Sequence, residues 1–358
     1  MQLLKINFAK VKFERGDKMK AVCVQDAVGM ILGHDMTEII PGKSKGPAFR
    51  KGHVIRIEDI PRLLNMGKEH IFVMEFKADD VHEDEAAMRM AKAAAGQGIN
   101  ISGPKEGKAN LTAACRGLLK IDEDALLEMN SMDEIMFACL HQNIIVEKDE
   151  AVAGTRVIPL MVKDWKVRKV EEICSNSNPV IQIKPFKQLK AGIVTTGSEV
   201  YHGRIKDQFG PVVKRKFEEL GCPVLKHLFS DDDPQMISAS IQELLDEGAD
   251  VIAVTGGMSV DPDDVTPLGI RMAGADILSY GAPTLPGAMF LLSYIGDVPV
   301  LGLPGCVMYS KRTIFDLVLP RIAAGEKVSR KDIVRLGHGG LCQNCKECRY
   351  PNCGFGKC

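Results

Sequence analysis

The sequence predicts an α/β protein in which a three-layer domain with a mostly parallel sheet follows a β-rich, mixed α+β region. Two observations carry this prediction. From residue 184 onwards, apolar runs rich in β-branched residues, such as AGIVTTG and DVIAVTGG, alternate with amphipathic stretches such as GPVVKRKFEELG. This alternation is typical of parallel strands that helices cover on both faces. Between residues 28 and 76, Gly and Pro interrupt short apolar runs, which is typical of a small β-rich module.

In the first half of the chain the pattern favours a short helix over 57–66 and an Ala-rich helix over 84–96, with Gly96 as its stop. The polar, Gly-containing stretch over 97–110 predicts a loop. Helical patterns follow over 111–119 and 123–140. Short apolar segments, NIIVEK and TRVIPLMV, predict strands.

In the second half, strands and helices are expected to take turns. Apolar runs that end at Gly or at a polar cluster predict strands over 191–197, 223–229, 250–257 and 298–305. Amphipathic stretches predict helices over 210–221, 233–248, 265–274 and 310–325.

The changes of pattern divide the chain into five expected segments. Met19 opens a stretch that reads as a more natural start, so residues before it are interpreted as an extension. The segments are an N-terminal extension (1–18), a β-rich module (19–110), a mixed α/β linking region (111–183), the α/β domain (184–330) and a Cys-rich tail (331–358).

Composition argues against several classes of partner. Lys plus Arg (46) nearly equals Asp plus Glu (47), so no global field would attract nucleic acid or an anionic membrane. No apolar run approaches the roughly 20 residues that span a bilayer, and the first residues lack a signal peptide's apolar core. Eleven cysteines without such a signal favour reduced thiols. We therefore expect a cytoplasmic protein that recognises a small ligand.

Four loops at predicted strand ends carry the unusual residues: TTGSEV, FSDDDPQMI, TGGMSVDPDD and LPGCVMYS. Glycines at such positions let a backbone approach an anion, and hydroxyl groups can donate to it. Carboxylates on the same edge are the ligands that Mg²⁺ prefers, often shared with substrate phosphates. The pattern therefore predicts a phosphate that binds together with its own cation. Alternatively, Asp233 and Asp264 cap helices and Asp261 with Pro262 shapes a turn.

These four motifs, in this order, resemble the molybdopterin-binding domain shared by molybdopterin molybdotransferases (MoeA type), molybdopterin adenylyltransferases (MogA type) and gephyrin. The resemblance covers residues 188–325 and implies a three-layer, MogA-like fold. Weaker similarity over 29–55 and 152–160 favours the molybdotransferase branch. That branch removes AMP from adenylylated molybdopterin while molybdate enters the dithiolene.

The resemblance also implies site residues. Asp232 and Asp264 match catalytic positions that act with Mg²⁺ at the phosphate end of the pterin. The implied substrate-binding residues are Thr196, Gly197, Ser198, Glu199, Thr255, Gly256, Gly257, Ser259, Pro304, Gly305 and Ser310.

Three positions depart from the molybdotransferase pattern. Ser198 stands where the motif has Asp, and Cys306 and Val307 replace Asn and Pro of the third loop. The changes remove a carboxylate, an amide and some stiffness. They put turnover in question more than ligand binding.

The final segment spaces five cysteines as C-x2-C-x2-C-x4-C-x4-C: Cys342, Cys345, Cys348, Cys353 and Cys358. Two-residue spacings let consecutive thiolates reach one metal centre, either Zn²⁺ or a [4Fe–4S] cluster. The alternative is a tail of free thiols.

Three functions follow as hypotheses. The first is a Mg²⁺-dependent molybdopterin molybdotransferase, with molybdopterin and molybdate as substrates and a molybdoenzyme as client. The second is a non-catalytic molybdopterin carrier or a redox or metal sensor. The third and weakest is a nucleotide-processing protein of the CinA type, which has a related domain. The resemblance further implies a homodimer.

Overall fold

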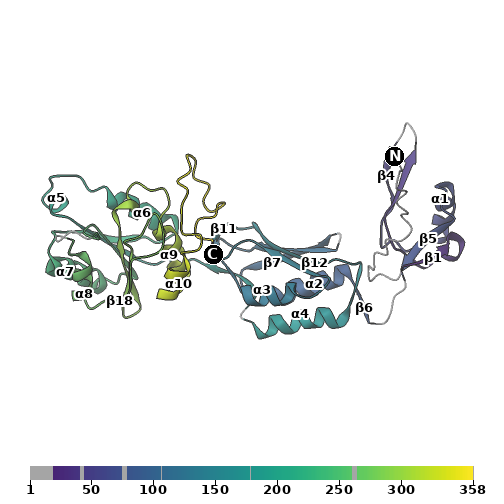
Figure 1. Ribbon diagram of the computed structural model, residues 1–358, viewed down its shortest axis with the longest axis horizontal. Coiled ribbons are helices and arrows are strands. Elements are labelled where there is room, and N and C mark those ends of the chain that lie inside the picture. Colours follow the sequence, from purple (N-terminus) through teal and green to yellow (C-terminus); the bar gives the residue numbers. More distant parts are fainter. Residues whose placement is uncertain are drawn as a thin grey trace, which may run out of the picture.

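The structure is a computed structural model that describes residues 19–40, 44–74, 79–105, 107–177, 179–259 and 264–357. The expected extension at residues 1–18 and Cys358 lie outside the described residues. Three units follow one another along the longest axis of the molecule (Figure 1). The buried apolar residues of the first two units run from Val24 to Val73 and from Val81 to Ile183, and those of the third run from Ala191 to Phe355.

The first unit is the expected β-rich module. An antiparallel sheet in the order β1-β5-β2 and the hairpin β3-β4 enclose a core that includes Leu32, Ile55 and Leu63. Its elements are β1 (Met19–Cys23), η2 (Val24–Asp26), β2 (Ile31–Leu32), β3 (Met36–Ile40), β4 (Ser44–Phe49), η3 (Ile57–Asp59), α1 (Ile60–Asn65) and β5 (His70–Met74). The helix expected over 57–66 is confirmed by η3 and α1.

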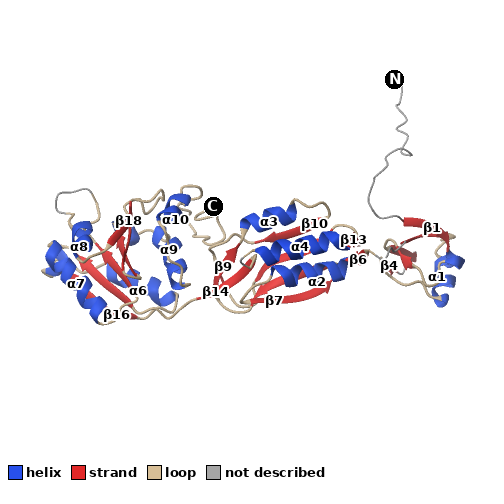
Figure 2. Ribbon diagram, turned by 90° about the horizontal axis from the view of Figure 1, so that it is seen from below, coloured by secondary structure: helices blue, strands red, loops and turns tan. Residues whose placement is uncertain are grey.

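The second unit packs helices against antiparallel strands, with α2 across the four-stranded sheet β10-β12-β8-β7 (Figure 2). Small side chains allow this close approach, since Ala86, Ala87 and Ala91 are fully buried. The elements are β6 (Asp80–His82), α2 (Glu83–Ala94), β7 (Ile99–Lys105), β8 (Lys108–Ala113), β9 (Gly117–Ile121), α3 (Glu123–Asn130), β10 (Ile135–Cys139), β11 (Ile145–Val146), β12 (Ala151–Val157), β13 (Met161–Lys163), α4 (Asp164–Asn176) and β14 (Ile181–Pro185).

Three sequence-based expectations in this unit are wrong. The loop expected over 97–110 contains β7, and the helix expected over 111–119 is replaced by β8 and β9. The helix expected over 123–140 ends at Asn130, and β10 follows it. The Ala and Leu content suggested helices, but Leu111 and Ala113 are buried in alternation, as a strand requires. The boundary expected after residue 110 falls inside β8.

The third unit is a three-layer α/β domain, as expected. Its elements are β15 (Ala191–Thr196), α5 (Ser198–Tyr201), α6 (Phe209–Glu219), β16 (Val224–Ser230), α7 (Pro234–Asp246), β17 (Val251–Thr255), α8 (Thr266–Met272), β18 (Asp276–Tyr280), β19 (Leu291–Ile295), β20 (Val298–Leu303), η4 (Gly305–Val307), α9 (Ile314–Ala323) and α10 (Arg330–Arg335). The described strands form a six-stranded sheet in the order β16-β15-β17-β20-β19-β18, parallel across the first four strands and antiparallel across the last three.

Successive side chains of each buried strand point to opposite faces of the sheet, and each face packs against a different set of helices. In β17, Val251 and Ala253 pack into the core that contains α6 and α9, whereas Ile252 and Val254 pack into the core that contains α7. The strands therefore carry apolar side chains on both faces. None of the helices in the described part of the chain is long and apolar enough to cross a bilayer.

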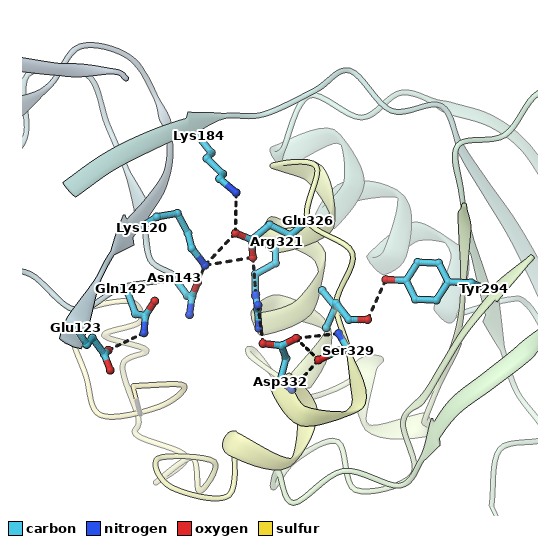
Figure 3. A network of polar contacts seen from close by, with 11 residues as sticks. Lys120, Glu123, Gln142, Asn143, Lys184, Tyr294, Arg321, Glu326, Ser329 and Asp332 are labelled. Carbon is cyan, nitrogen blue, oxygen red and sulfur yellow. Dashed lines mark hydrogen bonds and ion pairs between the residues drawn. The ribbon is translucent and has the colours of Figure 1, made fainter. Parts of the chain in front are cut away.

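A polar network joins the second and third units (Figure 3). The Glu326 carboxylate pairs with Lys120 (2.9 Å) and Lys184 (3.3 Å) of the second unit and with Arg321 (2.9 Å) of α9. Burial alone would raise the pKa of Glu326, but hydrogen bonds from Arg321 and Lys120 hold it below its usual value. Glu326 is thus a charged residue through which the two units are in contact.

Candidate functional site

The sheet brings the four unusual loops to one edge. Thr195 of β15 pairs with Thr255 of β17, which pairs with Leu303 of β20. On the other side, Thr196 pairs with Ser230 of β16. Each of these residues stands at or next to the end of its strand, so the segments that follow leave the sheet side by side.

The first two loops are joined through a backbone amide and a carboxylate. The Ser198 N–H donates to Oδ2 of Asp232 at 2.9 Å, and the Asp232 N–H donates to Oδ1 of Asp231 at 2.9 Å. Gly197, between β15 and α5, has a φ of +137°, a conformation that favours glycine. Asp232 is therefore fixed in position against the start of α5.

Four carboxylates gather at this edge, and we call Glu199, Asp231, Asp232 and Asp264 the acidic edge. Burial, opposed by the Ser198 amide, raises the pKa of Asp232, and the charges of Asp231, Glu199 and Asp264 raise it further. The structure thus brings the predicted Asp232 and Asp264 together with Glu199, and it adds Asp231, which the sequence analysis did not single out. Asp261 and Asp263 lie outside the described residues.

The donors of the acidic edge fit Mg²⁺, which prefers carboxylate oxygens and keeps positions for water and substrate phosphates. Within the described residues, no three His, Cys, Asp or Glu side chains are close enough to hold a metal ion on their own. Phosphate oxygens of a ligand would complete such a site. Asp232 and Asp264 are the side chains that would hold the ion.

The third loop depends on two glycines. Gly256 and Gly257 have φ values of +91° and +52°. A Cβ on Gly256 would collide with the Thr196 carbonyl oxygen, and one on Gly257 would lie 2.8 Å from the Thr266 hydroxyl. Only glycine allows this loop to cross so close to the end of β15.

Tyr280 of β18 holds the same loop and was missed by the sequence analysis. Its hydroxyl lies 3.2 Å from the carbonyl oxygens of both Met258 and Ser259. Burial raises the pKa of Tyr280, and the charge of Asp264 raises it further. The predicted Ser259 is exposed at this position. No local motif surrounds Tyr280, because its contact depends on pairing between distant strands.

The predicted threonines lie inside the domain. The Thr196 hydroxyl is 3.1 Å from that of Thr266, and the Thr255 hydroxyl donates to that of Thr195 at 3.3 Å. Thr195 in turn contacts His227 Nε2 at 2.9 Å. These hydroxyls connect neighbouring strands and α8 beneath the loops. Their polar groups are satisfied within the protein.

The fourth loop, which begins at Pro304 and Gly305, turns back through a 3-10 helix. The Ser310 N–H donates to the Cys306 carbonyl at 2.9 Å, and Val307 is fully buried. Burial raises the pKa of the Cys306 thiol, so the thiol stays protonated at neutral pH. Cys306 is therefore a packed thiol rather than an activated nucleophile.

Other charged residues near the loops have structural partners. Asp233 caps α7 by accepting from the Gln235 N–H at 2.8 Å, as the capping alternative expects. Arg312 pairs with Asp316 at 2.9 Å, and the Lys311 ammonium donates to the Lys346 carbonyl at 2.8 Å. Lys311 and Arg312 both line a cavity beside the tail.

The described cysteines of the tail surround one cavity of about 510 Å³. Cys342, Cys345, Cys348 and Cys353 line it, and so does Ser310 from the fourth loop. Cys358, predicted as a fifth ligand, lies outside the described residues. The tail cavity therefore adjoins the segment that follows the predicted pterin-binding loop.

Comparison with known proteins agrees with the domain that the loops suggested. Residues 192–324 match the family model described as "Probable molybdopterin binding domain", and residues 21–75 match "Domain of unknown function (DUF8806)". A CinA-like protein of Mycobacterium avium is 39% identical over 77 residues, covering 22% of this chain and 18% of that protein. One from Mycobacterium sp. (strain MCS) is 36% identical over 90 residues, covering 25% and 21%.

The chain thus spans about a fifth of the length of these curated relatives. Among solved structures, the molybdopterin biosynthesis enzyme MoaB of Thermus thermophilus is 20% identical, covers 38% of this chain and 98% of its own, and has a TM-score of 0.31. CinA of Thermoplasma acidophilum, of unknown function, is 19% identical and covers 40% and 98%, also with a TM-score of 0.31. Residues 192–324 are similar to a molybdopterin-binding domain, and no family is established for the chain as a whole.

Proposed function

We propose that the chain is a Mg²⁺-dependent molybdopterin molybdotransferase that releases AMP from adenylylated molybdopterin as molybdate enters the dithiolene. The match over residues 192–324 supports a pterin ligand. The observation that carries the phosphate chemistry is the acidic edge, where burial and the charges of carboxylates from three loops raise the pKa of Asp232. A phosphate can approach such a group only together with a cation.

Each residue of the site has a distinct task in this proposal. Mg²⁺ held by Asp232 and Asp264 would offset phosphate charge and polarise the phosphorus. Ser198 keeps the Asp232 carboxylate in place through its amide. Gly256 and Gly257 let the third loop pass close to Thr196 and Thr266, and Tyr280 holds that loop in place.

The bond changes are those of pyrophosphate hydrolysis. A water oxygen bonds to the adenylyl phosphorus, and the bond from that phosphorus to the bridging oxygen breaks. AMP and the terminal phosphate of molybdopterin separate, and one proton leaves to solvent. Ser198, in place of a carboxylate, leaves the site with one negative charge fewer than the motif that it resembles.

The test is AMP release by anaerobically purified protein given adenylylated molybdopterin, Mg²⁺ and molybdate. We expect release by the wild type and a loss on the order of 10²-fold in Asp264→Ala, because the cation loses a ligand. Asp233→Asn is the matched control, since Asn caps helices as well as Asp does. Pterin that binds without any release would instead favour the carrier or sensor.

A second candidate is a nucleotide-processing protein of the CinA type, favoured by the 39% identity over 77 residues. The same edge would then act on the pyrophosphate of a nucleotide such as ADP-ribose. Offering ADP-ribose in the same assay separates the two. AMP released from ADP-ribose but not from adenylylated molybdopterin would replace the first proposal with the second.

A further inference from the structure

The tail cavity has an unusual lining for a protein surface. Four cysteine thiols are accompanied by three cations, Lys311, Arg312 and Arg349, and no Asp or Glu is among the described residues that line it. Apolar side chains such as Leu341 and Phe355 complete the wall. The lining favours an occupant that binds thiolates and is itself negatively charged.

The cations keep a net positive charge despite their own partners. Arg312 pairs with Asp316, but Asp316 also binds the buried Lys216, so two cations share one carboxylate. Lys311 donates to a carbonyl oxygen, which leaves its charge uncompensated. The guanidinium of Arg312 also lies 5.1 Å from the Tyr350 ring centroid, which fixes it beside the cavity.

The tail is anchored at both ends of the cysteine run. The Cys342 N–H donates to the Leu285 carbonyl at 2.8 Å, and the Tyr350 hydroxyl donates to the Asp316 carbonyl at 3.3 Å. Phe355 is 4% exposed and belongs to the core of the α/β domain. Cys345 and Cys348 lie between these anchors on an exposed turn. The fold therefore holds the cysteine run against the domain.

No three of the described cysteines lie close enough to hold a single metal ion, yet four of them line one cavity, and this arrangement favours a cluster over a single ion. Four thiolates close around Zn²⁺ at about 2.3 Å and need no cavity between them. A [4Fe–4S] cluster has a body of eight atoms, so its ligands surround a space. The C-x2-C-x2-C spacing is also the run that bacterial iron–sulfur proteins use, although the C-x4-C spacing from Cys348 to Cys353 is not the ferredoxin one.

We propose that the tail binds a [4Fe–4S] cluster through Cys342, Cys345, Cys348 and Cys353. A preassembled cluster enters the cavity, each thiol loses a proton to solvent, and the four thiolates replace the ligands that the cluster carried. The cluster with its thiolates is anionic, and Lys311, Arg312 and Arg349 balance its charge. This inference does not depend on the proposed function.

The test is anaerobic reconstitution of the full chain with ferric iron, sulfide and dithiothreitol, followed by desalting. We expect about four iron and four sulfide per chain, visible charge-transfer absorption and an EPR signal after reduction with dithionite. The double variant Cys345→Ser with Cys348→Ser is expected to lose at least half of the iron and the EPR signal. Both positions are exposed, so its melting temperature should stay close to that of the unloaded wild type.

Cys23→Ser is the matched control, because this thiol lies in the first unit, within 3.0 Å of Gln25 Oε1. It should retain the full cluster. Iron bound equally by the double variant would overturn the assignment. So would one tightly bound Zn²⁺ per chain, in a four-sulfur environment by X-ray absorption, that excludes iron. AMP release is measured separately, so failure here leaves the molybdotransferase proposal standing.

Discussion

The acidic edge and the tail cavity lie on the same domain and have opposite electrostatics. Carboxylates from three loops crowd around Asp232, whereas three cations and no described carboxylate line the cavity. Ser310, Lys311 and Arg312 all line the cavity. The difference teaches that the two regions suit ligands of opposite charge. In the two proposals, a phosphate binds at the acidic edge together with a cation, whereas an anionic cluster is balanced by the cations that line the cavity.

The largest expected effect concerns Asp316. This residue pairs with Arg312 beside the tail cavity and is not part of the acidic edge. Asp316→Ala should lower the free energy of unfolding by about 3–5 kcal/mol, because Lys216, only 7% exposed, would be left unpaired. Asp297→Ala is the control, since its partner Lys327 is exposed and the cost should stay below about 1 kcal/mol. Equal costs in urea denaturation would show that the ion pair adds nothing.

The acidic edge has its own structural test in Gly256. Gly256→Ala should cost about 3 kcal/mol, because the new Cβ meets the fixed Thr196 carbonyl. Gly274→Ala shares a positive φ (+85°) but has open space around it, so we expect about 1 kcal/mol. Urea denaturation of both variants measures the difference, and a Gly256 variant as stable as Gly274→Ala would contradict the close approach.

The pH dependence of Asp232 provides a further test of the acidic edge. Its folded pKa is raised, so the ionised carboxylate opposes folding at neutral pH when Mg²⁺ is absent. Asp232→Asn should therefore raise the melting temperature without Mg²⁺ and weaken Mg²⁺ binding about 10-fold.

In the wild type, Mg²⁺ affinity should fall as the pH drops through this raised pKa, before ordinary carboxylates protonate. Calorimetric titration over pH measures the affinity. Asp233→Asn should behave as wild type, because Asp233 caps α7. The prediction fails if the two variants respond alike.

The smallest effects come from two tyrosine hydroxyls, one in each region. Tyr280→Phe removes a donor to Met258 and Ser259, and Tyr350→Phe removes a donor to Asp316. Each should cost about 1 kcal/mol. Tyr280→Phe should slow AMP release and leave iron binding unchanged, and Tyr350→Phe should do the reverse. Matching losses in both assays would mean that the regions are not separable.

The sequence was sufficient for the parallel part of the sheet but not for its antiparallel edge. Apolar runs that end at or near glycine predicted β15, β17 and β20. These strands are buried on both faces, so almost every residue in them is apolar or small. The strands β18 and β19, each as long as β17, went unpredicted, and in β18 only Ser279 is buried. In the second unit, the stretch over 111–119 has the composition of a helix, but β8 pairs with the neighbouring β7 and the distant β12, and β9 pairs with the distant β14.

The candidate site shows the same limit. The motifs identified Asp232 and Asp264 as members of one group, since both follow the carboxyl ends of parallel strands. They did not identify Tyr280, whose contact with Ser259 spans 21 residues and depends on strand order. They also suggested Thr196 and Thr255 as ligand donors, whereas the hydroxyls of both have partners within the protein.

The cores of the three units have a consequence for how the chain melts. The buried core residues of each unit come from one continuous stretch, 24–73, 81–183 or 191–355. Each unit can thus collapse from its own part of the chain, and heating should produce more than one calorimetric transition. The calorimetric enthalpy will then exceed the van't Hoff enthalpy. Both proposed ligand sites belong to the last stretch, so Mg²⁺ and iron should each shift the same transition and leave the others in place.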